Sequence, residues 1–476
     1  MAFSAQCGSA ACLPDDTLAR YHRLALQVLE TTGIRVPCSE VLSAMAEAGF
    51  KVSAEEQQVR FPPDLVEAAL ARIPRSITLG GRAPADDLEL NLDSLWVRPQ
   101  SGCVNVLDLD TGACRPATMA DVEAMARLTD VLPAVHLAAS LIYPNDVPET
   151  ARDTATLAVL LNTTRKHIFT QPYDLGSATR MAEMIEVVRG GAGAAVDRPP
   201  VTFILAPTSP LVIAPNELAI MRCAAAHRIP SFFGATPMCG ATGPMTLAGQ
   251  VVLMHAENLA GLVVMQVLQP GAPVIYGIRP ALMDMRTTAP LWGGVEFGLV
   301  SAVALQLARR KGLITDTEGT PTDSKALDEQ TGLEKGFNAA FAALYGANIA
   351  TGAGYIDMIM TASFEQLVID NDISGMMVRA RRGVEIDDDR LAVDLIEKVG
   401  SGGNYLTEPH TLRYLRTETF RPAVLDRQNR ANWERAGARD VAAVARERAR
   451  EAIRSHSTRP LPDHLMRELR RIAFGR

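Results

Sequence analysis

The sequence lacks the features that mark secreted, membrane-spanning and disulfide-stapled proteins. Its seven cysteines are odd in number, scattered, and include no Cys-x-x-Cys pair, so we expect neither a disulfide framework nor a common zinc motif. The most apolar runs, such as Leu262–Leu268, are far shorter than the roughly 20 residues that span a bilayer. Residues 1–16 have neither the basic nor the apolar region of a signal peptide. We therefore expect a reduced, cytoplasmic protein with no membrane partner.

Charge and cofactor motifs exclude further classes. The net charge is -7, without a long basic run ahead of the C-terminus, which argues against a nucleic-acid partner. The sequence has no Walker P-loop and no strand-linked Gly-x-Gly-x-x-Gly, and Gly190–Gly193 follows a predicted helix and is interpreted as a loop. It also lacks Asp-x-His-x-x-Gly, with which many proteins bind cobalamin. Cys223 and His227 could bind zinc by their spacing, but their apolar surroundings favour a packed helix, and no metal site is predicted.

What the sequence does contain is a series of short apolar runs that alternate with helical stretches. Strands alternating with helices predict a parallel sheet. Seven such units favour an α/β fold of the closed (β/α)8 type, the TIM barrel, with its eighth strand near an earlier hairpin; an open doubly wound sheet is the alternative. The runs are His136–Pro144, His167–Pro172, Val201–Pro210, Ser231–Gly240, Pro273–Pro280, Leu313–Gly319 and Asn348–Tyr355.

The chain divides into three predicted parts. Residues 1–130 form an N-terminal extension of helices and a β-hairpin, which turns at Asp110–Gly112 and is expected at the barrel's entrance. Residues 131–425 form the barrel. Residues 426–476 are rich in Arg, Ala and Glu and predict amphipathic helices that wrap the barrel or contact a second subunit. We therefore expect a homo-oligomer.

The carboxyl ends of the strands should build the site, as they do in parallel barrels. Gly and Pro at these ends also serve as ordinary turn residues. However, the ends combine the rings of Tyr276, Tyr355 and Phe232 with few charges. This combination suits a cation without hydrogen-bond donors, because aromatic faces attract such a cation. We expect Tyr276, Tyr355 and Thr208 to line one cavity.

Two polar segments are less easily assigned. Lys325 lies in Thr322–Asp328, which is either a wall of the site or a solvated helix start with a capping residue. His410 lies in a loop dense in polar groups, where it either acts in the site or makes a structural hydrogen bond that closes the barrel. The basic residues Arg279, Arg286 and Lys325 could each pair with a substrate carboxylate or form structural salt bridges. No catalytic residue is assigned; the candidate substrate-binding residues are Gln171, Thr208, Thr236, Tyr276, Arg279, Lys325, Tyr355 and His410.

Several segments, taken in order, resemble the trimethylamine methyltransferase superfamily over roughly residues 15 to 470. The resemblance implies a corrinoid-dependent methyltransferase barrel. Founding members of the family carry pyrrolysine and demethylate trimethylamine, whereas many relatives lack that residue and act on quaternary amines such as glycine betaine. This sequence shows only standard residues, so it is similar to the second group. The matching segments are Met238–Gly249, Asn258–Gly261, Thr322–Gln330, Glu365–Asp370, Gly402–Gly403, His410–Thr411, Asp426–Arg427 and Trp433.

The resemblance implies transfer of a methyl group from a betaine-like quaternary amine to the cobalt of a separate corrinoid protein, with no cofactor bound by this chain. A quaternary nitrogen already makes its methyl groups electrophilic, so the enzyme mainly needs to orient the N–CH3 bond and exclude water. Two alternatives stay open. One is a barrel lyase or aldolase with Lys325 as a Schiff-base amine, which requires that lysine inside the barrel. The other is a non-catalytic protein that binds quaternary amines.

Overall fold

The computed structural model describes residues 10–191 and 193–475. Eight parallel strands form its central sheet, in the order β6-β18-β17-β14-β12-β11-β10-β9. The backbone N–H groups of His136 and Leu137 donate to the carbonyl of Val97 at 2.8 and 3.0 Å, and so join the two ends of the sheet into a barrel. The strands are β6 (Trp96–Pro99), β9 (Ala138–Ala139), β10 (Ile168–Thr170), β11 (Val201–Leu205), β12 (Ser231–Ala235), β14 (Val274–Ile278), β17 (Thr315–Glu318) and β18 (Ile349–Ala353).

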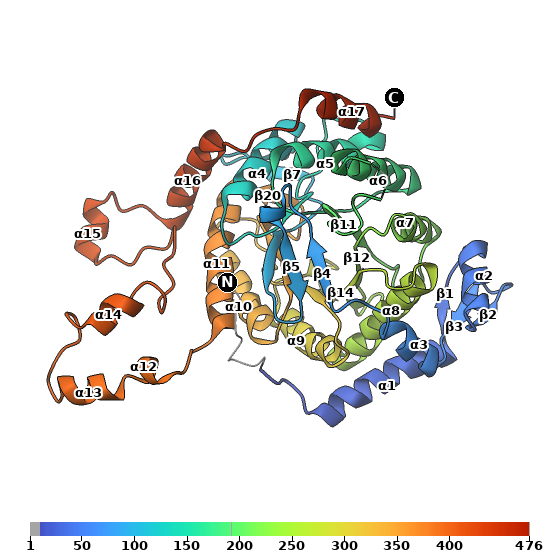
Figure 1. Cartoon of the computed structure of the whole chain (residues 1–476), viewed down its shortest axis with the longest axis horizontal. Helices are drawn as coiled ribbons and strands as arrows, with labels where there is room; N and C mark the ends of the chain where they lie inside the picture. The colour runs from blue at the N-terminus through green and yellow to red at the C-terminus, as the bar shows by residue number, and fades with distance from the viewer. Residues whose placement is uncertain (1–9, 192, 476) are drawn as a thin grey trace.

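One helix follows each barrel strand and covers its outer face, which confirms the predicted (β/α)8 fold (Figure 1). The eighth strand, expected near the hairpin, is β6, which directly precedes the hairpin. The first strand of the barrel therefore lies within residues 1–130, the part predicted to be the N-terminal extension. The helices are α4 (Met119–Val131), α5 (Arg152–Thr163), α6 (Leu175–Arg189), α7 (Pro215–Ala226), α8 (Leu247–Leu268), α9 (Val295–Arg310), α10 (Glu329–Leu344) and α11 (Phe364–Arg382).

The barrel helices begin and end where local chemistry favours it. Side chains of Asp174, Thr246, Asp328 and Ser363 accept a hydrogen bond from a backbone N–H in the first turn of α6, α8, α10 and α11, which stabilises a helix start. At its other end α6 stops at Gly190, which has a left-handed φ of 90°. Glycine adopts that conformation at low cost. The glycine-rich stretch is therefore a helix end, as predicted.

Helix α8 is long and apolar enough by composition to cross a bilayer, but 78% of its most apolar window is buried inside the protein. It packs against β12 and β14 on one side and against α1 and α3 on the other. A helix that is covered on several sides is expected to be apolar around its whole circumference. Its composition is thus that of a core helix.

The N-terminal part covers the barrel from two directions. Its first helices pack on α8, and the β4–β5 hairpin closes the amino end of the barrel, where Ile77, Leu79 and Leu90 join the apolar side chains that begin the strands. The elements are α1 (Asp15–Thr31), β1 (Ile34–Arg35), α2 (Ser39–Glu47), β2 (Lys51–Ser53), β3 (Gln58–Arg60), α3 (Pro63–Leu70), β4 (Ser76–Leu79), η1 (Pro84–Asp86) and β5 (Leu88–Asn91).

Small sheets lie beyond the carboxyl ends of the strands. The predicted hairpin is present: β7 and β8 pair in antiparallel fashion around the turn at Asp110–Gly112, and β7 also pairs with β20, which follows the last barrel strand. The additional elements at this end are β7 (Asn105–Leu107), β8 (Cys114–Pro116), η2 (Glu149–Ala151), β13 (Met238–Cys239), β15 (Ala281–Met283), β16 (Pro290–Leu291), β19 (Tyr355–Ile356) and β20 (Thr361–Ser363).

The C-terminal region both wraps the barrel and projects from it. Helix α16 (Val441–Ser455) packs on α11 and α4, and α17 (Asp463–Ala473) packs on α5 and α6. Between α11 and α16 the chain extends away from the barrel and carries four short helices (Figure 1). These are α12 (Asp388–Leu391), α13 (Val393–Val399), α14 (Pro409–Tyr414) and α15 (Arg430–Arg435). The projection begins at residue 383, inside the part predicted to be barrel.

Candidate active site in the barrel

Charged side chains fill the carboxyl half of the barrel's interior. Asp316 of β17 is fully buried and accepts from Arg98 Nε at 2.9 Å and from Arg279 Nη2 at 2.7 Å. Thr351 Oγ1 donates to the same carboxylate at 2.6 Å. The two guanidinium groups hold the pKa of Asp316 below its ordinary value, although burial acts in the opposite direction. A carboxylate with this many donors stays ionised in a dry interior.

Aromatic rings complete the walls around these arginines. The guanidinium carbon of Arg279 lies 4.7 Å from the centre of the Phe232 ring, and that of Arg98 lies 4.7 Å from the centre of the Phe169 ring. The Phe232 ring reaches this place because Gly234 and Gly277 have no side chain: a Cβ on Gly277 would lie 2.4 Å from the ring. The rings thus hold protein cations, so their faces are already in use.

Glu318 is the member of the cluster that is left with an open acceptor. Its Oε1 accepts from Gln100 Nε2 at 2.5 Å. Its Oε2 is buried, has no hydrogen-bond partner among the described residues, and lies 3.8 Å from Arg279 Nε. Burial raises the pKa of Glu318, while the neighbouring Arg279 and the Tyr355 hydroxyl oppose that rise. An unsatisfied buried carboxylate oxygen costs free energy unless a ligand or a water meets it.

Tyr355 joins the cluster through its hydroxyl rather than its ring. The pKa of this phenol is raised well above 10 by burial and by the Glu318 carboxylate beside it, and its oxygen accepts from the backbone N–H of Thr322 at 3.3 Å. The ring face is covered by Lys335, whose Nζ lies 4.7 Å from the ring centre and pairs with Asp370 Oδ2 at 3.0 Å. Lys335 therefore occupies one face of the Tyr355 ring.

Of the predicted site residues, Arg279 and Tyr355 belong to this cluster, and two more lie next to it. Gln171 directly follows β10 and Thr236 directly follows β12, and both are half-buried. Side chains alternate along a strand, so Gln171 shares the side of Phe169, and Thr236 that of Phe232. These four residues gather at the carboxyl end of the barrel, where the sequence predicted a site.

The structure does not place Tyr276 in the barrel. Its side chain is fully buried on the outer face of β14, where its hydroxyl lies 2.8 Å from His255 Nδ1 of α8. The other ring nitrogen of His255, Nε2, lies 2.9 Å from Nδ1 of His22 in α1. The predicted shared cavity of Tyr276, Tyr355 and Thr208 is therefore wrong: β14 is buried on both faces, and its alternation points Tyr276 outward and Arg279 inward.

Three other predicted residues also lie outside the cluster. Thr208 is exposed in the loop after β11, where its backbone N–H donates to the carbonyl of Val212 at 2.8 Å. Lys325 is exposed ahead of α10, and its Nζ donates to the carbonyl of Asp323 at 2.7 Å. The aldolase alternative required Lys325 inside the barrel, and this exposed position does not meet that requirement. His410 lies in the projecting region, and its Nε2 is 3.0 Å from the carbonyl of Asp389, so it does not close the barrel.

The residues that sequence reasoning missed are the charged ones within strands. Arg98 lies in β6, with Gln100 directly after it, and Asp316 and Glu318 alternate with threonines in β17. A charge in a strand that must be buried on both faces is a strong signal, because it requires a partner. That signal could have identified the cluster.

No group of three or more His, Cys, Asp or Glu residues suited to a metal ion occurs in the described part of the chain. His227, one of the two residues considered for zinc, has its Nδ1 3.2 Å from a carboxylate oxygen of Glu186. Burial raises the pKa of the Cys223 thiol, which disfavours the thiolate that zinc requires.

The fold and the charged cluster at the carboxyl ends of the strands together define a (β/α)8-barrel enzyme. In fold, the chain is similar to the monomethylamine methyltransferase (MtmB) of Methanosarcina barkeri, with a TM-score of 0.51 and 11% identity over 94% of this chain and 96% of that one. In sequence, residues 3–474 match the trimethylamine methyltransferase (MTTB) family. The chain therefore belongs to that family, and it is a methyltransferase.

Characterised relatives cover nearly the whole chain. The trimethylamine methyltransferase MttB of Desulfitobacterium hafniense (strain DSM 10664 / DCB-2) is 32% identical over 459 residues, 96% of this chain and 92% of that protein. MttB of Methanosarcina barkeri (strain Fusaro / DSM 804) is 32% identical over 473 residues, 96% of this chain and 93% of that protein. The glycine betaine methyltransferase of Desulfitobacterium hafniense (strain Y51) is 30% identical over 423 residues, 88% of each.

Proposed function

We propose that this methyltransferase takes a methyl group from a betaine-like quaternary amine and transfers it to the cobalt of a separate corrinoid protein. The observation that carries the amine part of the proposal is the open Oε2 of Glu318. It is a buried carboxylate oxygen at the carboxyl end of a barrel strand, where barrel enzymes bind their substrates. A cationic substrate would give this oxygen a second positive neighbour besides Arg279, without disturbing the paired Arg98 and Asp316.

The kind of cation follows from the chemistry of methyl transfer. A quaternary ammonium has no N–H, so it needs a negative charge and apolar surroundings but no specific acceptor. When its C–N bond breaks, the bonding pair stays with nitrogen and a neutral amine leaves. A tertiary amine would have to expel a strongly basic amide anion. The sequence consists of standard residues only, so the quaternary substrate is the one that its side chains can serve.

In this proposal the residues of the cluster bind and orient rather than transfer protons. Glu318 faces the substrate cation, Gln100 fixes the Glu318 carboxylate, and Arg98, Arg279 and Asp316 form the rigid base below it. Arg279 also donates to the carbonyls of Ile278 and Asp316. Because its donors are engaged in this way, we do not assign it to the carboxylate of a betaine.

The corrinoid is assigned to a partner because the chain lacks the Asp-x-His-x-x-Gly pattern, and its nucleophilic cobalt would be supplied by that partner. We also propose a cytoplasmic location, since the reduced cobalt requires a reducing compartment, and self-association of the chain.

Calorimetric titration with glycine betaine, choline and trimethylamine tests the proposal. We expect saturable binding of a quaternary amine, and a loss of at least about tenfold in affinity for Glu318→Gln, the size of effect expected when a buried charge loses its partner. Glu67→Gln on α3, which packs on α8 outside the barrel, is the matched control. Transfer is then measured with an added corrinoid protein in its reduced state. Absence of binding by every quaternary amine would remove the proposal, and binding without transfer to any corrinoid protein would favour a binding protein instead.

A further inference from the structure

Residues 383–416, here called the arm, extend from the barrel without a core of their own. The arm contains α12, α13 and α14 and lies at the far left of Figure 1. None of its residues is buried. Helices of four, seven and six residues are far shorter than the ~12–15 residues at which an isolated helix becomes even marginally stable. The arm therefore needs a surface against which to pack.

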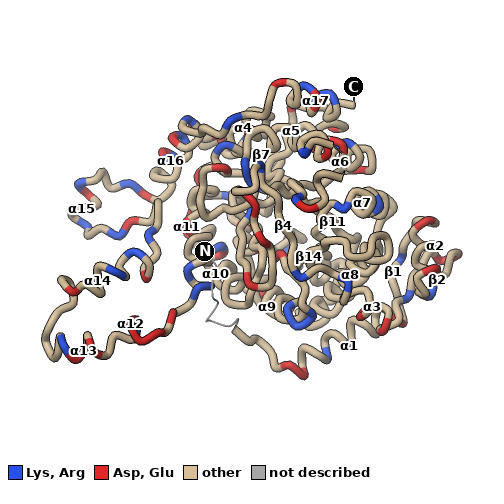
Figure 2. Tube along the Cα trace, viewed as in Figure 1, with Lys and Arg blue, Asp and Glu red and all other residues tan. Residues whose placement is uncertain are grey.

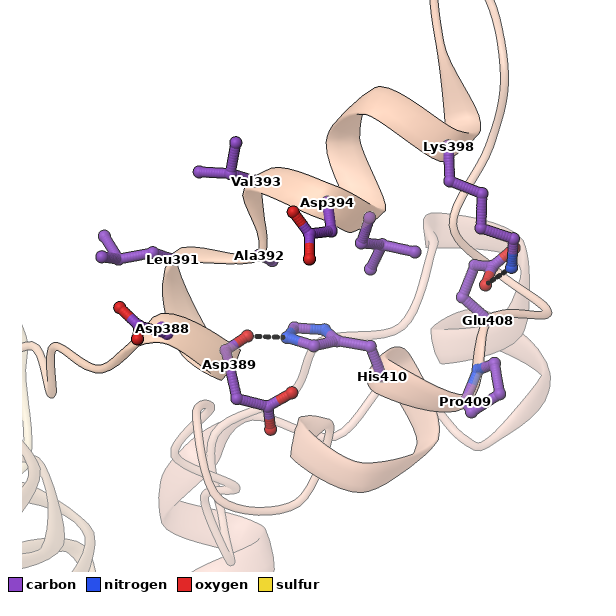
Figure 3. Close-up of a pocket in the computed structure, with 11 residues that line it drawn as sticks. Asp388, Asp389, Leu391, Ala392, Val393, Asp394, Lys398, Glu408, Pro409 and His410 are labelled. Carbon is purple, nitrogen blue, oxygen red and sulfur yellow. Dashed lines mark hydrogen bonds and ion pairs between the residues drawn. The ribbon is translucent and has the colours of Figure 1, made fainter.

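Two ion pairs lie within the arm, whereas many of its apolar side chains are exposed among the described residues. Lys398 pairs with Glu408 at 2.7 Å and Arg413 pairs with Asp389 at 2.5 Å, and both signs of charge alternate along this region (Figure 2). A groove of about 690 Å³ lies between α13 and α14, and Leu391 and Val393 are among the residues that line it (Figure 3). Seven of the arm's exposed apolar residues, 41% to 81% accessible, are Val384, Leu391, Val393, Ile396, Tyr405, Leu406 and Leu412.

A second apolar surface, exposed among the described residues, lies on the outer face of α10. Leu333 is 73% exposed, Phe337 52% and Leu344 47%. From Gly332 to the end of the helix, the exposed positions in the described chain are all uncharged. Gly332 and Gly336 lie one turn apart on this face, and a Cβ at either would meet no atom within 4 Å. The face is thus apolar and flat, which permits close approach of another segment.

The two surfaces lie on the same flank of the molecule. Arg381 Nη1, at the end of α11, donates to the carbonyl of Ala343 at the end of α10, at 3.4 Å. The arm begins two residues further along the chain. The arm and the face of α10 can therefore meet the same neighbour.

We propose that the arm of one chain packs on the outer face of α10 of a second copy, in a reciprocal two-fold contact. This arrangement covers both surfaces with one kind of contact, as isologous interfaces do. At roughly 150–200 Å² per fully exposed large side chain, the ten residues named above present on the order of 1,000 Å² per copy. Taken together, the two surfaces reach the ~800 Å² per partner of a stable interface. The ten residues that make up the two surfaces are uncharged, which favours an apolar partner surface.

Sedimentation velocity on the full-length chain tests this inference with two variants. Gly336→Leu fills the flat face of α10 without a clash inside one chain, and Leu is a better helix former than Gly, so the fold is retained. Leu406→Glu places a charge on the most exposed apolar residue of the arm. We expect each variant to weaken self-association about tenfold or more. Leu175→Glu, 48% exposed on α6 at the opposite flank, is the control and should associate like the wild type.

Mixing the two variants identifies which surfaces meet. A pair made of one Leu406→Glu chain and one Gly336→Leu chain retains one contact in which both surfaces are unaltered. The equimolar mixture should therefore associate more strongly than either variant alone. Three results would each overturn the inference. The wild-type chain could be monomeric, either variant could self-associate as strongly as the wild type, or the mixture could associate no more strongly than each variant alone. Thermal melting of each variant shows that its fold is intact.

Discussion

Arg279 donates from Nη2 to Asp316 Oδ1 at 2.7 Å across the inside of the barrel, and water reaches only 9% of the first side chain and none of the second. Arg98 binds the other oxygen of the same carboxylate. One acid thus holds two arginines that would otherwise repel each other. The barrel's interior is a charge network here, instead of the layers of branched apolar side chains that usually fill such barrels.

Removing Asp316 should therefore destabilise the protein strongly. Asp316→Leu leaves Arg98 and Arg279 buried without their common partner, and we expect a loss of about 3–5 kcal/mol in the free energy of unfolding, measured by urea denaturation. The control Glu123→Gln breaks the exposed pair with Arg127, and exposed pairs contribute only about 0–1 kcal/mol. Equal stability of the two variants would show that the network does not hold the barrel together.

Substrate binding should depend on pH through Glu318, whose pKa is raised by burial. We expect the affinity for a quaternary amine to be highest at high pH. It should fall as the pH is lowered through the raised pKa, because protonation removes the negative charge that faces the cation. Glu318→Gln should bind weakly at all pH values and show no such profile. A wild-type affinity that is independent of pH from 4 to 8, measured by calorimetry, would contradict this role; the interval brackets the roughly 4.3 of an exposed glutamate.

Tyr276→Phe should separate stability from binding. The variant leaves His255 Nδ1 without its buried partner, which should cost about 1–3 kcal/mol of stability. Because Tyr276 faces outward, the affinity for quaternary amines should stay at the wild-type value. Chemical denaturation and calorimetry on the same preparation give both quantities, and a selective loss of affinity would place Tyr276 back in the site.

We expect Glu257 to make the free energy of unfolding fall as pH rises. Burial raises the pKa of this carboxyl to about 7, while the unfolded chain should ionise near the ordinary value of about 4.3. Between these values the folded state binds the extra proton, so stability is fully present below the lower value and is lost as pH rises towards 7. The melting temperature of Glu257→Gln should therefore decline less than that of the wild type between these pH values. Parallel curves for the two proteins would contradict the assignment.

Zinc content provides a further test. The purified full-length chain is expected to contain no stoichiometric zinc and to retain methyl transfer in the presence of a chelator. Elemental analysis and activity before and after chelation measure this. Activity that is lost on chelation and restored by zinc would require a metal site that the family assignment does not include.

The barrel was predictable from the sequence because its signal is local. Short apolar runs that end in Pro or Gly and alternate with helical stretches indicate parallel strands and their covering helices. The same local pattern placed the turn at Asp110–Gly112 and the end of α6 at Gly190. The eighth strand was expected near the hairpin, and β6 lies there, but its exact residues were not predicted because its partners β18 and β9 lie far along the chain or beyond the hairpin.

Which side of each strand faces the interior was decided only by the tertiary structure. A strand buried on both faces can be apolar on both, so its sequence pattern alone does not show which face is turned to the barrel interior. Tyr276 and Arg279 lie three residues apart and therefore point to opposite faces of the strand. The position of His410 was likewise out of reach, because nothing local shows that residues 383–416 leave the barrel. The sequence by itself determined the family and the order of strands and helices. Only closure of the barrel brought Arg98 and Gln100 of its first strand to Asp316 and Glu318 of its seventh, since contacts between residues 218 positions apart depend on the whole fold.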